Sequence, residues 1–122
     1  MTPGILTLLV ALQVKHLLAD YVLQGPYMFR NKGRYGHPGG LLHAGLHALL
    51  TAAILLLAGG LAWVSVGIAA VELLIHYHVD WAKERIGQRL KLTPATRGFW
   101  SLHGLDQLVH HLTYVAIAWV SG

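Results

Sequence analysis

The sequence contains no cysteine and very few charged residues. The absence of cysteine excludes disulfides and thiolate ligands, so any bound metal must be held by His, Asp, Glu or water. Charged residues make up 11% of the chain and hydrophobic residues 55%, whereas roughly 25% of residues are charged in ordinary soluble domains. This balance indicates a membrane protein or a protein with a very apolar core. A length of 122 residues leaves room for one domain, residues 1–122.

Four mostly apolar stretches stand out, each bounded by Gly, Pro or charged residues. Each is close to the roughly 20 residues that a bilayer-spanning helix requires. The stretches cover about residues 4–24, 40–58, 61–87 and 101–120. The sequence therefore predicts an all-α fold, an antiparallel bundle of four transmembrane helices. The first stretch has neither a basic leader nor a cleavage site, so we expect a retained helix rather than a signal peptide.

Basic residues predict the orientation of this bundle. Eight of the nine Lys and Arg residues fall in the first and third connections or beside them: Arg30, Lys32, Arg34, Lys83, Arg85, Arg89, Lys91 and Arg97. The positive-inside rule makes that side cytoplasmic and places both termini on the other side of the membrane. The same charge is interpreted as an orientation signal and a contact for anionic lipids rather than as a nucleic-acid site.

Each apolar stretch carries ionisable residues four positions apart. The pairs are His16 and Asp20, His43 and His47, His76 and Asp80, and Asp106 and His110. A spacing of four puts both side chains on one helical face, about 6 Å apart along the axis. In an up-and-down bundle all eight positions fall roughly 5 to 16 Å from the cytoplasmic helix ends. The sequence therefore predicts one polar layer.

A divalent metal site explains this layer better than mutual pairing of the side chains. Ionised groups at this depth cost about 3 kcal/mol each, so they must face the interior and be paired. Histidine and aspartate suit zinc, and a nitrogen and oxygen donor set also admits manganese, iron or nickel. Eight ligands exceed one tetrahedral site, which favours two zinc ions. A proton relay, a structural hydrogen-bond network and haem remain as alternatives.

Further polar residues lie close to the same helix faces. Glu72 is one turn before His76 and is a candidate general base or ninth ligand. Lys83 is a candidate catalytic residue that holds a substrate phosphate, a role that Arg30 and Arg34 could also fill. Metal-binding imidazoles usually donate their second N–H to neighbouring groups. Candidates for this supporting role are Gln24, His103, Gln107 and Tyr114.

Four segments carry a resemblance to known families: "HLLADYVLQ", "HAGLHALL", "HYHVDWAK" and "DQLVHHL". As a set, they resemble a family of small bacterial integral membrane proteins that is catalogued as a domain of unknown function. More distantly, they are similar to membrane-bound metal-dependent hydrolases, which are likened to zinc-dependent phospholipase C. That second resemblance implies metal-assisted phosphoester hydrolysis by the eight residues of the predicted layer.

The leading hypothesis is thus a membrane-embedded hydrolase of phosphoesters, which include phospholipids, at the cytoplasmic face. Two metal ions would lower the pKa of a bridging water and stabilise the leaving oxygen. A metal or proton transporter component, or a metal sensor, would use the same polar layer as a binding station. A structural membrane protein is the third hypothesis. Homo-oligomers are compatible with all three.

Overall fold

The computed structural model describes residues 4–122 and consists of helices and connections, with no strand in this range. The all-α prediction is confirmed. The elements are α1 (Ile5–Leu17), the π-helix η1 (Leu18–Val22), α2 (Pro26–Phe29), α3 (Pro38–Leu57), α4 (Ala62–Arg89) and α5 (Arg97–Ser121).

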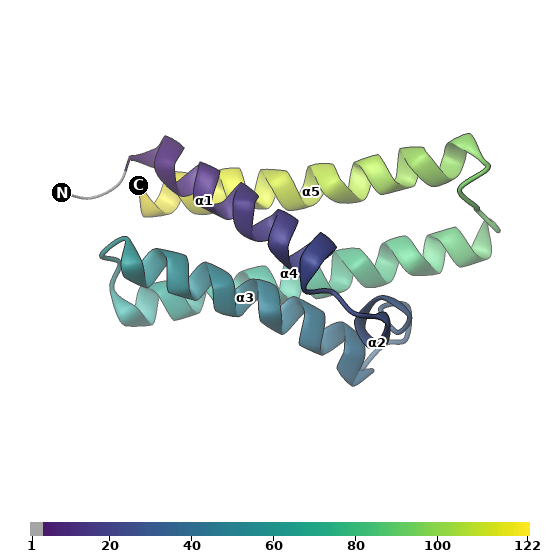
Figure 1. The fold of residues 1–122 in the computed structure, drawn as a ribbon, viewed down its shortest axis with the longest axis horizontal. Helices are drawn as coiled ribbons and strands as arrows, with labels where there is room; N and C mark the ends of the chain where they lie inside the picture. Colours follow the sequence, from purple (N-terminus) through teal and green to yellow (C-terminus); the bar gives the residue numbers. More distant parts are fainter. Residues whose placement is uncertain (1–3) are drawn as a thin grey trace.

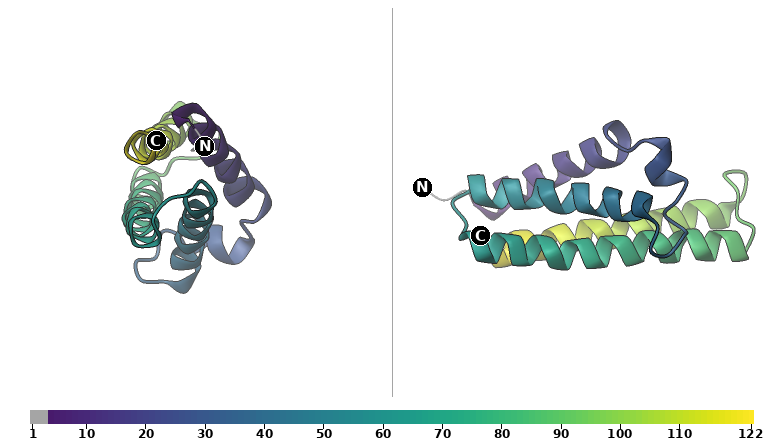
Figure 2. Two further views of the ribbon diagram at one scale, coloured as in Figure 1. Left: turned by 90° about the vertical axis from the view of Figure 1, so that its left-hand side faces the viewer. Right: turned by 90° about the horizontal axis from the view of Figure 1, so that it is seen from below.

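The four long helices pack around one interior. Helix α1 contacts α3 and α5, and α4 also contacts α3 and α5. Figures 1 and 2 show α3, α4 and α5 running alternately up and down, with α1 lying obliquely across α3 and α5. The C-terminus, the start of α1 and the α3–α4 turn lie at one end of the molecule (Figure 1). Helix α2 and the α4–α5 connection lie at the other end, which we call the cationic end because it carries the eight basic residues named above.

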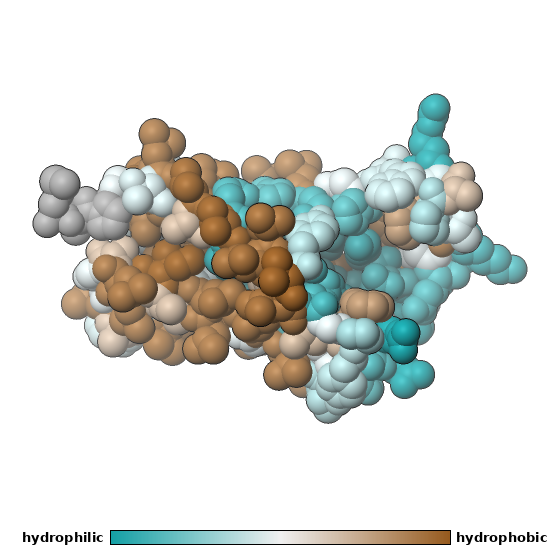
Figure 3. Space-filling view, in the orientation of Figure 1, coloured by the Kyte–Doolittle hydropathy of each residue, from teal (hydrophilic) through white to brown (hydrophobic). Residues whose placement is uncertain are grey.

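Three helices are long and apolar enough to cross a membrane: Ile5–Val22, Pro38–Leu57 and Ala62–Arg89. Helix α5 is not among them, because polar and charged residues occupy much of its first half. Figure 3 shows apolar side chains over the end that holds the α3–α4 turn and hydrophilic ones around the cationic end. The chain therefore has the features of a membrane protein, and three of the four predicted spans are confirmed as candidates.

The α3–α4 turn is made by two glycines at the predicted boundary. Gly59 has a φ of 88°, a conformation that a side chain disfavours. The N–H of Gly59 donates to the Leu56 carbonyl at 3.0 Å, and that of Gly60 donates to the Leu55 carbonyl at 2.9 Å. This is a Schellman ending, which satisfies carbonyls that the end of α3 would otherwise leave unpaired.

Helix α3 begins two residues earlier than the sequence predicts. Pro38 occupies its first turn, where a missing N–H costs nothing, and His37 caps it by accepting from the Gly39 N–H at 3.0 Å. Gly39 and Gly40 therefore belong to the helix rather than to a loop hinge. A Cβ at Gly39 would collide with the carbonyl oxygen of Tyr27, so α2 packs here because the side chain is absent.

The first predicted helix, residues 4–24, is divided in two. Its α-helical part ends at Leu17, and residues 18–22 form a π turn in which the Leu23 N–H donates to the Leu18 carbonyl at 2.8 Å. Single π turns inside helices occur frequently at functional sites. This one carries Asp20, so the irregular backbone coincides with one of the predicted ligands.

Helices α4 and α5 are both longer than predicted at the cationic end. Helix α4 ends at Arg89, two residues beyond the predicted end, and α5 begins at Arg97, four residues before the predicted start. Between them the Thr96 hydroxyl donates to the Thr93 carbonyl at 2.8 Å. At the opposite end of the bundle, an apolar core cluster consists of Leu8, Leu12, Leu55, Tyr114, Ile117 and Ala118.

Candidate metal centre

The structure brings all eight predicted residues together in one layer between four helical segments. The inward face of α3 presents His43 and His47, that of α4 His76 and Asp80, and that of α5 Asp106 and His110. His16 and Asp20 complete the layer from α1 and η1. Asp20 is half-buried, and the other seven are buried. Each pair meets its neighbours because a spacing of four keeps both members on the buried side of the helix.

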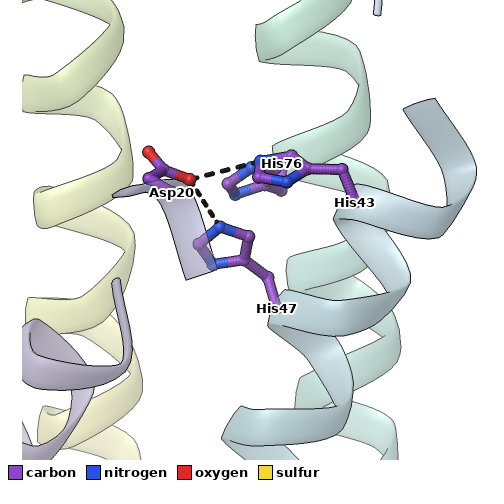
Figure 4. Close-up of side chains that lie close together, drawn as sticks. All are labelled: Asp20, His43, His47 and His76. Atoms are coloured by element: carbon purple, nitrogen blue, oxygen red, sulfur yellow. Dashed lines mark hydrogen bonds and ion pairs between the residues drawn. The ribbon is translucent and has the colours of Figure 1, made fainter. Parts of the chain in front are cut away.

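A first group of ligands consists of Asp20, His43, His47 and His76 (Figure 4). One possible ligand atom from each of the four lies within 4.8 Å of the others. Asp20 Oδ1 lies 2.8 Å from His47 Nε2 and 3.2 Å from His43 Nε2. Three imidazoles and one carboxylate at this separation form a donor set that suits tetrahedral zinc.

A second group consists of His76, Asp80 and His110, so His76 is shared by the two groups. Asp80 Oδ1 lies 3.1 Å from His110 Nε2, and its Oδ2 lies 3.1 Å from His76 Nε2. The His76 ring stacks between two others, with centroid distances of 4.0 Å to His47 and 4.1 Å to His110. Asp80 Oδ2 is also 3.5 Å from His43 Nε2, which links this group to the first.

His16 and Asp106 flank these two groups. His16 Nε2 lies 3.2 Å from Asp20 Oδ2 and 2.8 Å from Gln107 Oε1, and its Nδ1 lies 2.7 Å from the Tyr114 hydroxyl. Asp106 Oδ1 lies 3.2 Å from His110 Nε2. Six of the eight predicted ligands therefore form the two chelating groups. His16 lies beside the first group, and Asp106 lies beside the second.

The hydrogen bonding of the layer fits bound metal. His43 is fully buried and His76 is 2% exposed, yet the Nδ1 atoms of both lack a hydrogen-bond partner among residues 4–122. Their Nε2 atoms have only the ion-pair contacts with Asp20 and Asp80 given above, which are not aligned as hydrogen bonds. Each unsatisfied buried polar group costs about 1–3 kcal/mol. A divalent ion between these rings would use the free lone pairs, and the histidine and aspartate donors match the preferences of zinc.

A buried ion pair that the sequence analysis overlooked lies beneath the layer. The Lys15 ammonium is bonded to Glu72 Oε1, and both residues are buried. The same ammonium lies 3.0 Å from His47 Nδ1, donates to the His47 carbonyl at 3.2 Å and lies 4.7 Å from the centre of the Tyr114 ring. Lys15 thereby fixes the orientation of a candidate ligand.

The ion pair with Lys15 also defines the surroundings of Glu72, which the sequence predicts to be a general base or a ninth ligand. One carboxylate oxygen is bonded to Lys15, and the other has no hydrogen-bond partner among the described residues. The pair could have been found in the sequence. Lys15 is the only lysine or arginine in the first apolar stretch, residues 4–24, and an ionisable residue at membrane depth calls for an opposite charge at the same level.

Two lysines reach the layer from the cationic end. Lys83 Nζ lies 3.8 Å from Asp106 Oδ2 and 3.5 Å from His103 Nδ1. Lys32, in the connection between α2 and α3, places its Nζ 3.4 Å from Asp80 Oδ2. Sequence reasoning had selected Lys83 as a site residue and had used Lys32 only for orientation.

The remaining polar residues differ in their distance from the layer. Gln107 contacts His16, whereas the Gln24 amide donates to the Asp20 carbonyl at 2.9 Å and so supports the backbone of the π turn. His78 lies on the exposed side of α4, where its ring nitrogens are 2.9 Å from the Tyr35 hydroxyl and 2.7 Å from the Leu74 carbonyl.

A family model described as "Protein of unknown function (DUF3307)" matches residues 8–122. Because the match covers nearly the whole chain, the protein belongs to the DUF3307 family. No match was found among the curated proteins or among the solved structures.

Proposed function

We propose that this protein is a membrane-embedded, metal-dependent hydrolase that acts on phosphoesters. The observation that carries the proposal is the pair of chelating groups joined through His76, with ligand atoms no more than 4.8 Å apart within each group. Two neighbouring sites built from imidazole and carboxylate are the arrangement that two-metal hydrolysis uses. Zinc is the first candidate, and manganese, iron and nickel accept the same donors.

Formal charge supports an anionic substrate. The three aspartates of the layer carry three negative charges, and two divalent ions would carry four positive ones. The Lys15–Glu72 pair is neutral as a whole, whereas Lys32 and Lys83 each add a positive charge at the cationic side of the layer. The loaded site is therefore positive, as expected for a site that binds phosphate.

The proposed roles follow from these positions. Bound divalent ions would supply Lewis-acid chemistry and an acidified water. Lys32 and Lys83 hold the phosphate, the Tyr114 hydroxyl orients the His16 ring through its contact with Nδ1, and Lys15 holds the backbone of His47 by donating to its carbonyl. Such supporting contacts commonly change metal affinity 10–100-fold when they are removed.

The topology proposed for this function has all four long helices in the bilayer, α5 included. The polar half of α5 faces the layer through Asp106 and His110, which are buried. We attribute its low hydropathy to these site residues and not to exposure of the helix to water. The cationic end faces the cytoplasm, where basic residues are preferred, and both termini face the other side. Substrate and anionic membrane lipids then meet the protein at its cytoplasmic face.

Metal content tests the proposal. The detergent-purified protein, equilibrated with zinc and then freed of excess ion, should contain about two zinc ions per chain by elemental analysis. Because His76 is shared, His76→Ala should reduce the content below one ion. The matched control is His78→Ala, two residues along the same helix but outside the layer, which should retain the wild-type content.

A wild-type content below one ion per chain, or equal losses from His76→Ala and His78→Ala, would refute the metal centre. If zinc binds, hydrolysis of a soluble nitrophenyl phosphodiester and of phospholipid vesicles is measured with and without the metal. Full loading without turnover of any phosphoester would refute the hydrolase and favour metal transport or metal sensing.

A further inference from the structure

An apolar groove runs along the outer side of the α4–α5 contact at membrane depth. It has a volume of about 530 Å³ and is lined by Trp63, Gly67, Val71 and Ile75 of α4 and by Ala116 and Val120 of α5, among others. Its lining is almost wholly apolar. Glu72 also borders it and is the residue whose second carboxylate oxygen lacks a hydrogen-bond partner among residues 4–122.

A smaller crevice continues the same line toward the cationic end. It has a volume of about 150 Å³ and is bordered by Val79, Lys83 and Ile86 of α4 and by Asp106 and Val109 of α5, among others. Ile75 and Val79 are one turn apart on α4, and Thr113 and Val109 are about one turn apart on α5. Because Asp106 belongs to the metal layer, the groove and the layer meet at this crevice.

The dimensions of the groove favour a single hydrocarbon chain. Trp63 and Ile75 are 12 residues apart, which is about 18 Å along a helix. Dividing the groove's 530 Å³ by that length gives a mean cross-section of about 30 Å². A helix about 10 Å across needs about 80 Å², so a helix of a second copy does not enter the groove.

The charges at the cationic end favour an anionic headgroup on that chain. In a bilayer an apolar groove gains little by exchanging one hydrocarbon chain for another, since lipid tails are as apolar as leucine. Selectivity must therefore come from the polar end. The ammonium of Lys83 borders the crevice, and Arg85 and Arg89 follow it on α4 beside Trp81 and Ile86. A phosphate at this level would meet positive charge next to Asp106 and the metal layer.

We propose that the α4–α5 groove holds the acyl chain of an anionic phospholipid of the cytoplasmic leaflet, with its phosphate at the Lys83 crevice. The proposal rests on the proposed function, because it names membrane lipids as the phosphoester class that the metal layer acts on. Lys83 and Val71 are 12 residues apart, so a chain of about 18 Å would reach from the crevice into the groove. Substrate then enters sideways from the bilayer.

The test uses full-length protein in phosphatidylcholine vesicles that contain a little phosphatidic acid with a photoreactive acyl chain. Mass spectrometry of the irradiated protein should place most adducts in residues 63–75 and 113–120. Gly67→Phe adds a phenyl ring at the lining of the groove, at a position where no heavy atom lies within 4 Å of an added Cβ. We expect it to reduce those adducts at least fivefold, and Ala116→Phe on the facing wall to do the same.

The matched control is Gly45→Phe. Gly45 also lies in a candidate span and also has no heavy atom within 4 Å of an added Cβ, but it does not line the groove. It should leave labelling unchanged. A photoreactive phosphatidylcholine should give at least threefold fewer adducts than phosphatidic acid, and Lys83→Met should abolish that difference.

Adducts spread evenly around the wild-type bundle would overturn the lipid site, whatever the variants do. So would unchanged labelling in both Gly67→Phe and Ala116→Phe. Zinc content, measured on every sample, separates this proposal from the previous one. Wild-type protein that is labelled in the groove but binds no zinc would refute the metal centre and retain the lipid groove.

Discussion

The buried Lys15–Glu72 pair gives the sharpest test of how charge is stabilised inside this bundle. Lys15 is 3% exposed and Glu72 is 2% exposed, and each supplies the opposite charge for the other. Replacing Lys15 by Met keeps a similar length of side chain but leaves the Glu72 carboxylate buried without a cation. Replacing Glu72 by Leu leaves the Lys15 ammonium in the same position. Both single changes therefore create an uncompensated buried charge.

Each single variant should lose about 3–5 kcal/mol of unfolding free energy, the cost of breaking a buried ion pair from one side. The double variant Lys15→Met/Glu72→Leu removes both charges together. It loses the contacts of Lys15 with the His47 ring and carbonyl, 3.0 and 3.2 Å long, and with the Tyr114 ring, which are worth about 0.5–1 kcal/mol each. The double variant should therefore be about 1.5–3 kcal/mol less stable than the wild type, and more stable than either single variant.

The assay is reversible unfolding in mixed detergent micelles, followed by circular dichroism, for the four proteins of this mutant cycle. Additive losses in the double variant would refute the pairing, and so would a loss below 1 kcal/mol in either single variant. Zinc affinity measured alongside adds a second readout. It should fall in Lys15→Met, because the His47 backbone loses the ammonium that is bonded to its carbonyl.

Two further predictions concern single contacts. Tyr114→Phe removes the hydroxyl that lies 2.7 Å from His16 Nδ1 and should weaken zinc binding about 10–100-fold. The control Tyr21→Phe changes an exposed tyrosine and should leave zinc binding unchanged. Equal zinc affinities of the two variants in a titration would contradict the role of Tyr114. Gly39→Ala should lower the free energy of unfolding by about 1–3 kcal/mol, the usual cost of overpacking, because the new Cβ would collide with the Tyr27 carbonyl. The control Gly45→Ala meets no atom within 4 Å and should be neutral or stabilising by up to about 1 kcal/mol. Thermal unfolding compares the two variants, and a Gly39→Ala protein as stable as the wild type would contradict the close packing of α2 on α3.

The layer was predictable because it depends on helical period and depth alone. Once His43 and His47 are placed on one face near the start of a helix, an antiparallel neighbour with His76 and Asp80 near its end must bring them to the same level. These two properties survive small errors in the helix boundaries. The bounds of α3 and α5 were off by two and four residues at their starts, and the eight residues still converge.

A search for ionisable pairs four residues apart does not find Lys15, because the residues four positions before and after it are both alanine. The complete buried stripe of the first helix does include it. That stripe runs through Leu8, Leu12, Lys15, His16 and Ala19, at the spacings of a core-facing helix. The stripe includes the lysine, and Glu72 is the acidic residue at a matching depth on α4. A complete wheel of each apolar stretch would have paired them.

Other features depend on tertiary structure that no periodicity encodes. The π turn at residues 18–22 follows from how the chain leaves α1 toward α2, and nothing in the spacing of "LADYV" marks it. Lys32 belongs to a connection, and a connection has no period from which its direction can be read. Its 3.4 Å approach to Asp80 results from the packing of α2 against α3, which requires the missing side chain of Gly39.

The position of the apolar core favours the proposed hydrolysis over transport through a single chain. Below the layer the interior continues through the Lys15–Glu72 pair and is then filled by Leu8, Leu12 and Leu55. These apolar side chains separate the layer from the end that holds the α3–α4 turn. At the opposite end the side chains of Asp20, Lys32 and Lys83 remain 12%, 13% and 22% exposed. A transport path needs polar groups on both sides of its binding station, whereas a hydrolytic site needs access from one. Among residues 4–122 these partly exposed side chains of the layer lie toward the cationic end, as the proposed hydrolase requires and as a transport path through a single chain does not.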